Sequence, residues 1–235
     1  MEAEEKETVE QEADDVELLK KYQDYNEDVF GIIRIPGTVL NHPVMQTRSD
    51  EEYYLMRGLD KQYNPHGVPF LSARSEMEGK GGNRIIYGHN IHKKTRDIFC
   101  DLAGYEDLAF YQEHPIIETV SESGTRQWLI FAYYLVDNAD DEPFKYSDTV
   151  DFLSMAAYTA YMDEVGERNW LCVPYEHSID DTYLTLSSCS NELAGSGTNR
   201  MVVMAVQIPY GLDISAQVAD TVMAEEPRLP DKLSK

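Results

Sequence analysis

The chain has 235 residues, of which 43 are acidic and 20 are basic, so its formal net charge is -23 at pH 7. A hydrophobic share of 42% is enough for a packed core, and the length allows one domain or two, which excludes wholesale disorder. The acidic balance argues against a nucleic-acid-binding protein and against adhesion to an anionic membrane, because both depend on clustered Lys and Arg. The longest apolar stretch, residues 128–136, is about half the length of a membrane-spanning helix.

The N-terminal region is the most acidic part of the chain, with nine acidic and two basic side chains in residues 1–20. We interpret residues 1–20 as an acidic flexible arm or stalk, and we expect a helix only over residues 15–25. This start has no apolar signal-peptide region. Either the protein is cytosolic, or a membrane-targeting segment has been removed from it.

From residue 30 onward, short β-branched runs are separated by Gly and Pro turns, which is typical of a β-rich domain. The predicted elements are, in chain order, strands at 30–35 and 43–46, a helix at 49–57, and strands at 68–71 and 83–89. The helix is predicted from its Ser-Asp start and from the acidic residues of its first turn. The Gly-rich segment 79–82 lacks the ending of a phosphate-binding loop and is interpreted as a turn.

The second half continues the same pattern. Its predicted elements are, in chain order, helices at 97–102 and 105–113, strands at 116–120 and 127–136, a helix at 148–165, and strands at 182–187 and 201–208. The strand at 127–136 is almost entirely apolar or aromatic, so we expect it to be central and buried on both faces. Residues 190–199 form a predicted loop, and residues 209–235 form a C-terminal tail.

These elements predict a mainly β fold. Seven or eight strands with a few inserted helices and no regular strand–helix alternation favour a closed or nearly closed barrel over a doubly wound sheet. We assign one domain to residues 21–208.

Three cysteines, Cys100, Cys172 and Cys189, cannot all pair within one chain, so at least one is free. There is no CxxC motif and no Cys within four residues of a His, which argues against a structural zinc site. His89 and His92 have a spacing that would suit one side of a helical turn, but no third ligand is evident nearby. We therefore predict no metal and no cofactor.

Reactive residues lie at the ends of three predicted strands. They occur in Tyr-Gly-His89, in Thr-Leu-Ser-Ser-Cys189 and in Asn-Arg200. Each has an ordinary structural interpretation, because a His after a strand is commonly structural, a Cys at a strand end is commonly a small buried hydrophobe, and an Arg at a strand start is commonly solvated.

Taken together and in this order, these segments resemble the sortases, the cysteine transpeptidases of Gram-positive cell walls. The resemblance extends over most of residues 29–208. The run of residues 30–46, the Glu-Tyr-Tyr-Leu segment at 52–55 and the helix expected before the penultimate strand are similar to class B. The resemblance implies a closed sortase-type β-barrel of seven to eight strands with an N-terminal helix and inserted helices.

The resemblance also implies roles. Cys189 corresponds to the nucleophile, His89 to the general acid and base, and Arg200 to the group that binds the carbonyl oxygen or the oxyanion. The substrate would be a surface protein or pilin with a C-terminal sorting signal, cleaved after Thr and transferred to an amine on a peptidoglycan precursor or a pilin. Sortases sit outside the cell on an N-terminal membrane helix, so residues 1–20 would be the stalk that follows it, and we expect a monomer.

Four residues match positions that contact substrate in class B relatives. They are Leu55, Phe144, Ser187 and Ser188. Plain core packing or turn structure is an equally valid interpretation of each. Two departures from the family pattern stand out. Ser188 occupies a position where Thr is usual before the Cys, and Glu51 occupies a position where class B chains often have an Asn that touches substrate.

Two other hypotheses fit parts of the sequence. A papain-like cysteine hydrolase would need a Cys early on a helix with the His downstream, whereas here the His comes first and the Cys ends a strand. A catalytically idle module that binds a wall peptide or pilin would need a Cys189 that is buried or blocked. The sequence also leaves open a regulatory disulfide between Cys172 and Cys189.

Overall fold

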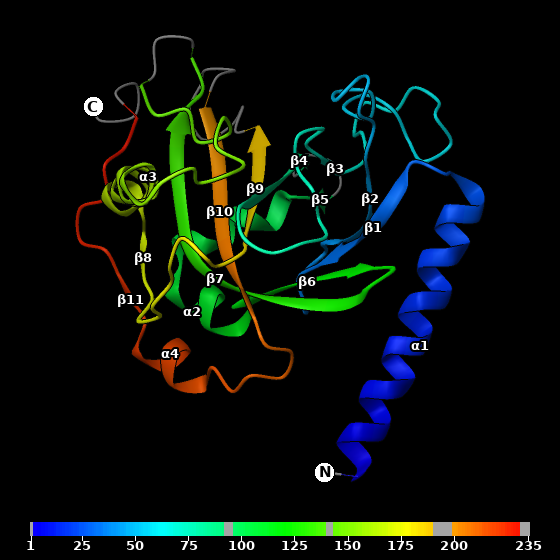
Figure 1. Cartoon of the computed structure of the whole chain (residues 1–235), viewed down its shortest axis with the longest axis horizontal. Coiled ribbons are helices and arrows are strands. Elements are labelled where there is room, and N and C mark those ends of the chain that lie inside the picture. The colour runs from blue at the N-terminus through cyan, green and yellow to red at the C-terminus, as the bar shows by residue number, and fades with distance from the viewer. Residues whose placement is uncertain (1, 92–95, 140–142, 190–198, 231–235) are drawn as a thin grey trace.

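Eight strands close into a mixed β-barrel, as predicted (Figure 1). The computed structural model describes residues 2–91, 96–139, 143–189 and 199–230, with residues 2–11 and Cys189 described by their backbone alone. The barrel strands are β1 (Val29–Arg34), β2 (Asn41–Met45), β3 (Phe70–Leu71), β4 (Asn83–Ile91), β6 (Ile116–Ser121), β7 (Gly124–Asp137), β9 (Tyr183–Cys189) and β10 (Asn199–Ile208). Their order is β3-β2-β1-β6-β7-β10-β9-β4, and pairing of β3 with β4 closes the barrel. The pairs β2–β3 and β4–β9 are parallel.

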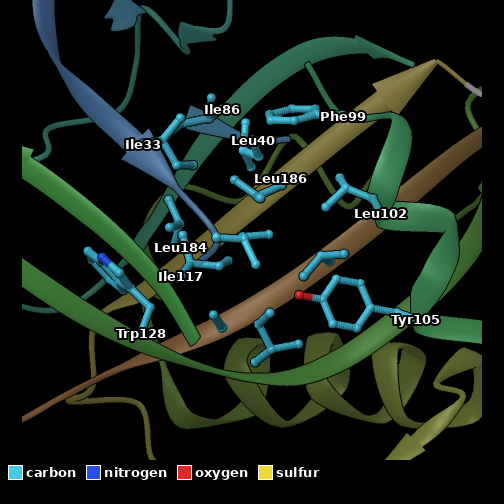
Figure 2. Packing of buried hydrophobic residues seen from close by; sticks show 14 of the residues in the cluster. Ile33, Leu40, Ile86, Phe99, Leu102, Tyr105, Ile117, Trp128, Leu184 and Leu186 are labelled. Carbon is cyan, nitrogen blue, oxygen red and sulfur yellow. The ribbon is translucent and has the colours of Figure 1, made fainter. Parts of the chain in front are cut away.

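β7 is buried on both faces, which confirms the prediction for residues 127–136. One set of its side chains, including Trp128 and Ile130, belongs to the core inside the barrel. The intervening set, including Leu129 and Tyr134, belongs to a second core outside it. Figure 2 shows side chains of the inner core, among them Trp128 and Leu184, converging from several strands. A strand that faces two cores has no polar face, so its sequence is continuously apolar.

The N-terminal helix is longer than predicted. α1 spans Glu2–Tyr25 instead of beginning near residue 15. It lies outside the barrel beside β1 and β6 (Figure 1). Arg34 of β1 fixes it, because the guanidinium forms ion pairs with Asp15 of α1 and Glu118 of β6, both at 2.6 Å. Leu19 of α1 is buried in the same region. The packed part of the helix therefore begins before residue 21, the predicted start of the domain.

The helix predicted at residues 148–165 begins seven residues later. α3 spans Met155–Arg168, and its N-cap is Ser154, whose side chain accepts a hydrogen bond from Ala157 N. The segment before α3 bonds to β4 instead of continuing the helix, since Val150 O accepts a hydrogen bond from Asn83 N at 2.7 Å. Leu153, which lies within the predicted helix, is outside the observed one and is 91% exposed. α3 precedes β9, the penultimate barrel strand, as expected.

The prediction of a helix at residues 49–57 is wrong. The segment is a series of turns in which Tyr53 N and Leu55 N donate to carbonyls three residues back. Tyr54 is completely buried, and its hydroxyl donates to Asp28 and accepts from Asn26. This tertiary anchor overrides the local helical signal.

The helices predicted at residues 97–102 and 105–113 both begin three residues later, and the second is also shorter. The chain forms β5 (Asp97–Ile98), the 3₁₀ helix η1 (Cys100–Glu106) and α2 (Leu108–Glu113). Ile98 has a positive φ of 52°, which a regular helix does not accommodate. β5 pairs with the end of β4.

The predicted C-terminal tail contains regular structure. α4 (Ser215–Asp220) is followed by β11 (Val222–Met223), which pairs with β8 (Leu171–Cys172). Most of the loop predicted at 190–199 lies outside the described residues, and so does His92. Within the described parts of the chain, every helix is too short or too polar to cross a bilayer.

Candidate active site

Three neighbouring barrel strands bring His89, Cys189 and Arg200 into one row. In the parallel pair β4–β9, His89 lies opposite Cys189. In the antiparallel pair β9–β10, Cys189 lies opposite Arg200. Residues directly opposite one another across a sheet share a face. We call these three positions the register row.

The register row lies on the outer face of the barrel. Ile86 of β4, Leu186 of β9 and Met201 of β10 all belong to the core inside the barrel. Successive residues of a strand alternate between its two faces. Positions 89, 189 and 200 are each an odd number of residues from these core positions, so they belong to the opposite face.

A backbone carbonyl holds the ring of His89. Nε2 of His89 lies 2.9 Å from the carbonyl oxygen of Leu55, and because that oxygen can only accept, Nε2 carries the proton of the bond. Nδ1 is left for proton exchange. The backbone of His89 is fixed too, since the Phe99 N–H donates to His89 O at 3.0 Å. Gly88 permits this arrangement, because a Cβ there would lie 2.8 Å from the Phe99 ring.

Arg200 supplies a permanent positive charge at the other end of the row. Its side chain is half-buried, and Nη1 donates to the carbonyl of Asn199 at 3.1 Å. A guanidinium stays protonated at any working pH. An anion that forms between His89 and Arg200 is therefore stabilised by the charge of Arg200.

A groove of about 210 Å³ runs along this outer face. The strands β4, β9 and β10 contribute its floor, the segment around residues 51–55 lies at the β3 side, and the segment after β7 lies at the β10 side. The lining residues are Glu51, Glu52, Leu55, Phe70, Tyr87, Gly88, Asn138, Tyr146, Ser147, Ser187 and Arg200. The register row therefore lies beside this groove, whose lining is partly apolar and partly polar.

The four expected substrate-contacting residues occupy different places. Leu55 and Ser187 line the groove. Ser188 is completely buried, on the opposite face of β9 from Ser187. Phe144 lies in the outer core beneath α3, where its ring centroid is 5.3 Å from that of Tyr161, and it is absent from the described groove lining.

The groove also contains residues that the sequence patterns did not single out. Tyr87 shares the face of His89 because it lies two residues earlier on β4, so strand alternation could have identified it. Tyr146 had no such signal. Its hydroxyl lies 2.7 Å from Oγ of Ser187, and its carbonyl accepts a hydrogen bond from Tyr161 of α3 at 3.1 Å. α3 therefore supports the groove through Tyr146.

Glu51 is fixed at the β3 side of the groove. Its Oε1 accepts a hydrogen bond from the hydroxyl of Ser72 and another from Ala73 N at 2.9 Å. Its charge reaches the groove floor, since the pKa of Tyr87 is raised first by burial and then by its neighbours Tyr146 and Glu51. This carboxylate has a defined orientation in the groove.

The other two cysteines lie elsewhere. Cys100 is buried in η1, where burial, followed by the nearby charge of Asp101, raises the pKa of its thiol. Cys172 is exposed on β8 and forms no disulfide. In the part of the chain that the structure describes, no three His, Cys, Asp or Glu side chains gather as metal ligands would.

The chain is similar to known proteins over most of its length. The family model for the sortase domain matches residues 33–208. Sortase B of Staphylococcus aureus is 30% identical over 199 residues, which cover 80% of this chain and 78% of that protein. Sortase B of Listeria monocytogenes is 29% identical over 174 residues, which cover 74% and 68%.

The fold agrees with these similarities. The solved structure of a Staphylococcus aureus sortase B–substrate complex superposes with a TM-score of 0.71 at 27% identity, covering 82% of this chain and 85% of that one. The family match, the two relatives and the common barrel lead to one assignment. The chain is a class B member of the sortase family of cell-wall transpeptidases.

Proposed function

We propose that this chain cleaves a C-terminal sorting signal after Thr, forms a thioacyl enzyme on Cys189, and transfers the protein to an amine on a peptidoglycan precursor or a pilin. The observation that carries the proposal is the register row, in which His89 and Arg200 flank Cys189 on adjacent strands. Acyl transfer requires a nucleophile, a proton donor and an oxyanion-binding group, and we assign these roles to three residues on adjacent strands, of which Arg200 lines the groove.

The first half-reaction forms the thioester. A thiol with a pKa of about 8.5 is only slightly ionised at neutral pH, so the positive charge of Arg200 favours the thiolate of Cys189. The thiolate attacks the Thr carbonyl carbon, and a C–S bond forms. Nδ1 of His89 takes up the proton that the Cys189 thiol loses, and the resulting imidazolium donates this proton to the departing amine as the C–N bond breaks.

The second half-reaction reverses the proton transfer. The acceptor amine attacks the thioester, His89 takes up the proton that the amine loses, and the thiolate of Cys189 leaves. Because the Nε2 proton of His89 is bonded to the carbonyl of Leu55, we assign both transfers to Nδ1. Arg200 stabilises the oxyanion in each step.

Substrate contact is assigned to Leu55 and Ser187, because both line the groove. Ser188 supports the end of β9 from the buried face. The place of Phe144 in the outer core favours support of the groove from beneath over direct contact. We propose that the enzyme acts as a monomer at the extracytoplasmic face of the membrane on surface proteins or pilins.

The test is cleavage of a fluorogenic sorting peptide by the wild type and by Cys189→Ala. We expect the variant to lose cleavage while its circular dichroism spectrum is unchanged, because the change removes the nucleophile and leaves the barrel intact. Undiminished cleavage by Cys189→Ala contradicts the proposal. Mass analysis of the product with and without an added amine separates transfer from the hydrolysis expected of a plain peptidase.

An idle binding module would behave differently. Its Cys189 would resist alkylation at neutral pH in the folded protein while the peptide still bound. We expect rapid alkylation of Cys189 instead, because a thiol next to a guanidinium is more ionised than a free one. Peptide mapping after alkylation distinguishes Cys189 from Cys100 and Cys172.

A further inference from the structure

Within the part of the chain that the structure describes, Glu51 is held in the groove through one of its two carboxylate oxygens. Oε1 accepts the bonds from Ser72 and Ala73. Among the described residues, no Lys, Arg or His forms an ion pair with Glu51. A carboxylate can accept about four hydrogen bonds, so, as far as the described residues are concerned, Oε2 retains capacity to bind a donor. The fixed side chain also loses little conformational entropy when it binds one.

The position of Glu51 defines which part of a substrate it can meet. Ser72, which holds Glu51, donates its backbone N–H to Ile85 O of β4. Tyr87 of β4 lies in the same groove and precedes His89 by two residues, or about 7 Å along a strand. An extended peptide advances about 3.3 Å per residue. Glu51 therefore suits a substrate side chain within a few residues of the cleaved bond.

The positive charge of Arg200 does not cancel this site. Arg200 is on β10, whereas Glu51 is bonded to residues that directly follow β3, and β4 and β9 lie between those strands. Three strand spacings amount to roughly 14 Å. At physiological ionic strength the Debye length is about 8 Å, so a cation near Glu51 is largely screened from Arg200.

We propose that Glu51 is a specificity-determining residue that binds a Lys or Arg side chain of the sorting signal close to the cleaved bond. This inference rests on the proposed function, because it assigns a substrate to the same groove. A cationic side chain gives Oε2 a charge-assisted hydrogen bond. A neutral apolar side chain would desolvate the carboxylate without compensation, and an acidic one would be repelled. Glu52, the exposed neighbour, also lines the groove, and the guanidinium of Arg74 donates to Ser147 O of the same lining at 2.7 Å.

The two glutamates offer a matched pair of variants. Glu51→Gln keeps an amide oxygen that can accept the bonds from Ser72 and Ala73, so it removes the charge and preserves the anchor. Glu52→Gln removes the same charge from the adjacent, exposed residue, whose side chain does not share the bonds that hold Glu51. If the two variants differ in their preference for Lys, the difference is due to the fixed carboxylate of Glu51 and not to the overall charge of the groove.

The experiment measures kcat/KM for quenched peptides in which Lys, Gln or Glu occupies, in turn, each of the three positions before the cleaved Thr and the two after it. We expect the wild type to prefer Lys over Gln at one position by roughly tenfold, as for a charge-assisted hydrogen bond. Glu51→Gln should abolish that preference, so that this variant has similar kcat/KM values for the Lys and Gln peptides. Glu52→Gln should retain most of it.

The outcomes separate this inference from the proposed function. A wild type that cleaves the Lys and Gln peptides equally at every position overturns the inference and leaves the transpeptidase proposal intact. Two other results also overturn the inference alone. One is a preference for Lys that survives in Glu51→Gln, and the other is an effect of Glu51→Gln that is confined to the KM of the acceptor amine. Cleavage of no peptide by the wild type, with Cys189 still alkylated, counts against the proposed function itself.

Discussion

The Nε2 atom of His89 lies 2.9 Å from the carbonyl oxygen of Leu55. This bond links the end of β4 to the series of turns that precedes β3. It fixes one tautomer of the neutral imidazole, with the proton on Nε2 and the lone pair on Nδ1. Leu55 therefore contributes its backbone to the orientation of His89 as well as its side chain to the groove. Gly67 packs against the same carbonyl, because a Cβ at Gly67 would lie 2.5 Å from Leu55 O.

Gly67→Ala should impair catalysis more than folding. The added methyl group would also lie 2.7 Å from Tyr54 O, and its collision with the Leu55 carbonyl must move the acceptor of the His89 proton. We expect a lower kcat, because the proton on Nε2 loses its partner and the imidazole loses its fixed orientation. The measurement is the steady-state kinetics of peptide cleavage, together with thermal unfolding.

The control for this variant is Gly211→Ala. Gly67 and Gly211 have similar positive φ values, 62° and 73°, so Ala costs about 1–2 kcal/mol of backbone strain at either position. A methyl group on Gly211, however, would have none of the described atoms within 4 Å apart from its chain neighbours. Equal losses of activity in the two variants would mean that strain, and not the Leu55 carbonyl, is responsible.

A candidate site could be proposed from the sequence because its residues occur in short local motifs. His89, Cys189 and Arg200 are recognisable from the few residues around each of them. Their register is not local, since it depends on the parallel pairing of β4 with β9, which comes from distant parts of the chain. Similarly, the closure of the barrel depends on β3, a strand of only two residues.

The errors in the predicted fold arise where tertiary contacts replace local preferences. The segment 49–57 has a helical sequence pattern, but the burial of Tyr54 and its bonds to Asp28 and Asn26 hold it in turns. The start of α3 is delayed because the backbone at Val150 bonds to β4. Neither partner can be identified from the local sequence.

Arg200→Lys should reduce kcat although it keeps the positive charge. Lys presents a compact ammonium in place of a planar fork of donors, so it does not reproduce a fixed donor to the oxyanion. Loss of one such donor lowers kcat by roughly a hundredfold to a thousandfold. Steady-state kinetics on the sorting peptide measures the effect, and wild-type kcat in Arg200→Lys would remove Arg200 from this role.

Tyr146→Phe should lower stability through Ser187. Both side chains are almost completely buried, and the change leaves the Ser187 hydroxyl without its partner at 2.7 Å. An unsatisfied buried hydroxyl costs about 1–3 kcal/mol. Adding Ser187→Ala should recover part of the loss, and urea unfolding of the single and double variants measures the coupling. Strict additivity would show that the two hydroxyls do not stabilise each other.

Asp15→Ala should loosen α1 from the barrel. The Asp15 carboxylate is buried and forms a bidentate pair with Arg34, so its removal leaves Arg34 with Glu118 alone. Breaking a buried pair in this way costs about 3 kcal/mol. Glu17→Ala is the control on the same helix, because its pair with Lys21 is exposed and should contribute no measurable stability. Equal unfolding midpoints for the two variants would contradict the anchoring role of Asp15.

His177 should make folding stability depend on pH. Its ring packs 4.6 Å from that of Phe131, and Nδ1 lies 2.8 Å from the hydroxyl of Tyr158. Tyr158 in turn contacts the hydroxyl of Tyr183, which donates to Ser178 O. A neutral His177 that donates from Nδ1 completes a chain of hydrogen bonds in one direction. Burial lowers the pKa of His177, and the charge of Asp181 offsets this only in part.

The sign of the effect follows from the two states. The unfolded chain protonates His177 at its ordinary pKa of about 6.5, whereas the folded chain protonates it only at lower pH. Stability is therefore complete above about pH 6.5 and falls as the pH decreases toward the folded pKa. His177→Gln should make the free energy of unfolding less dependent on pH between about pH 5 and pH 7 in urea titrations. His42, whose pKa is also lowered by burial, is present in both proteins, so identical slopes would exclude His177 as a source of the dependence.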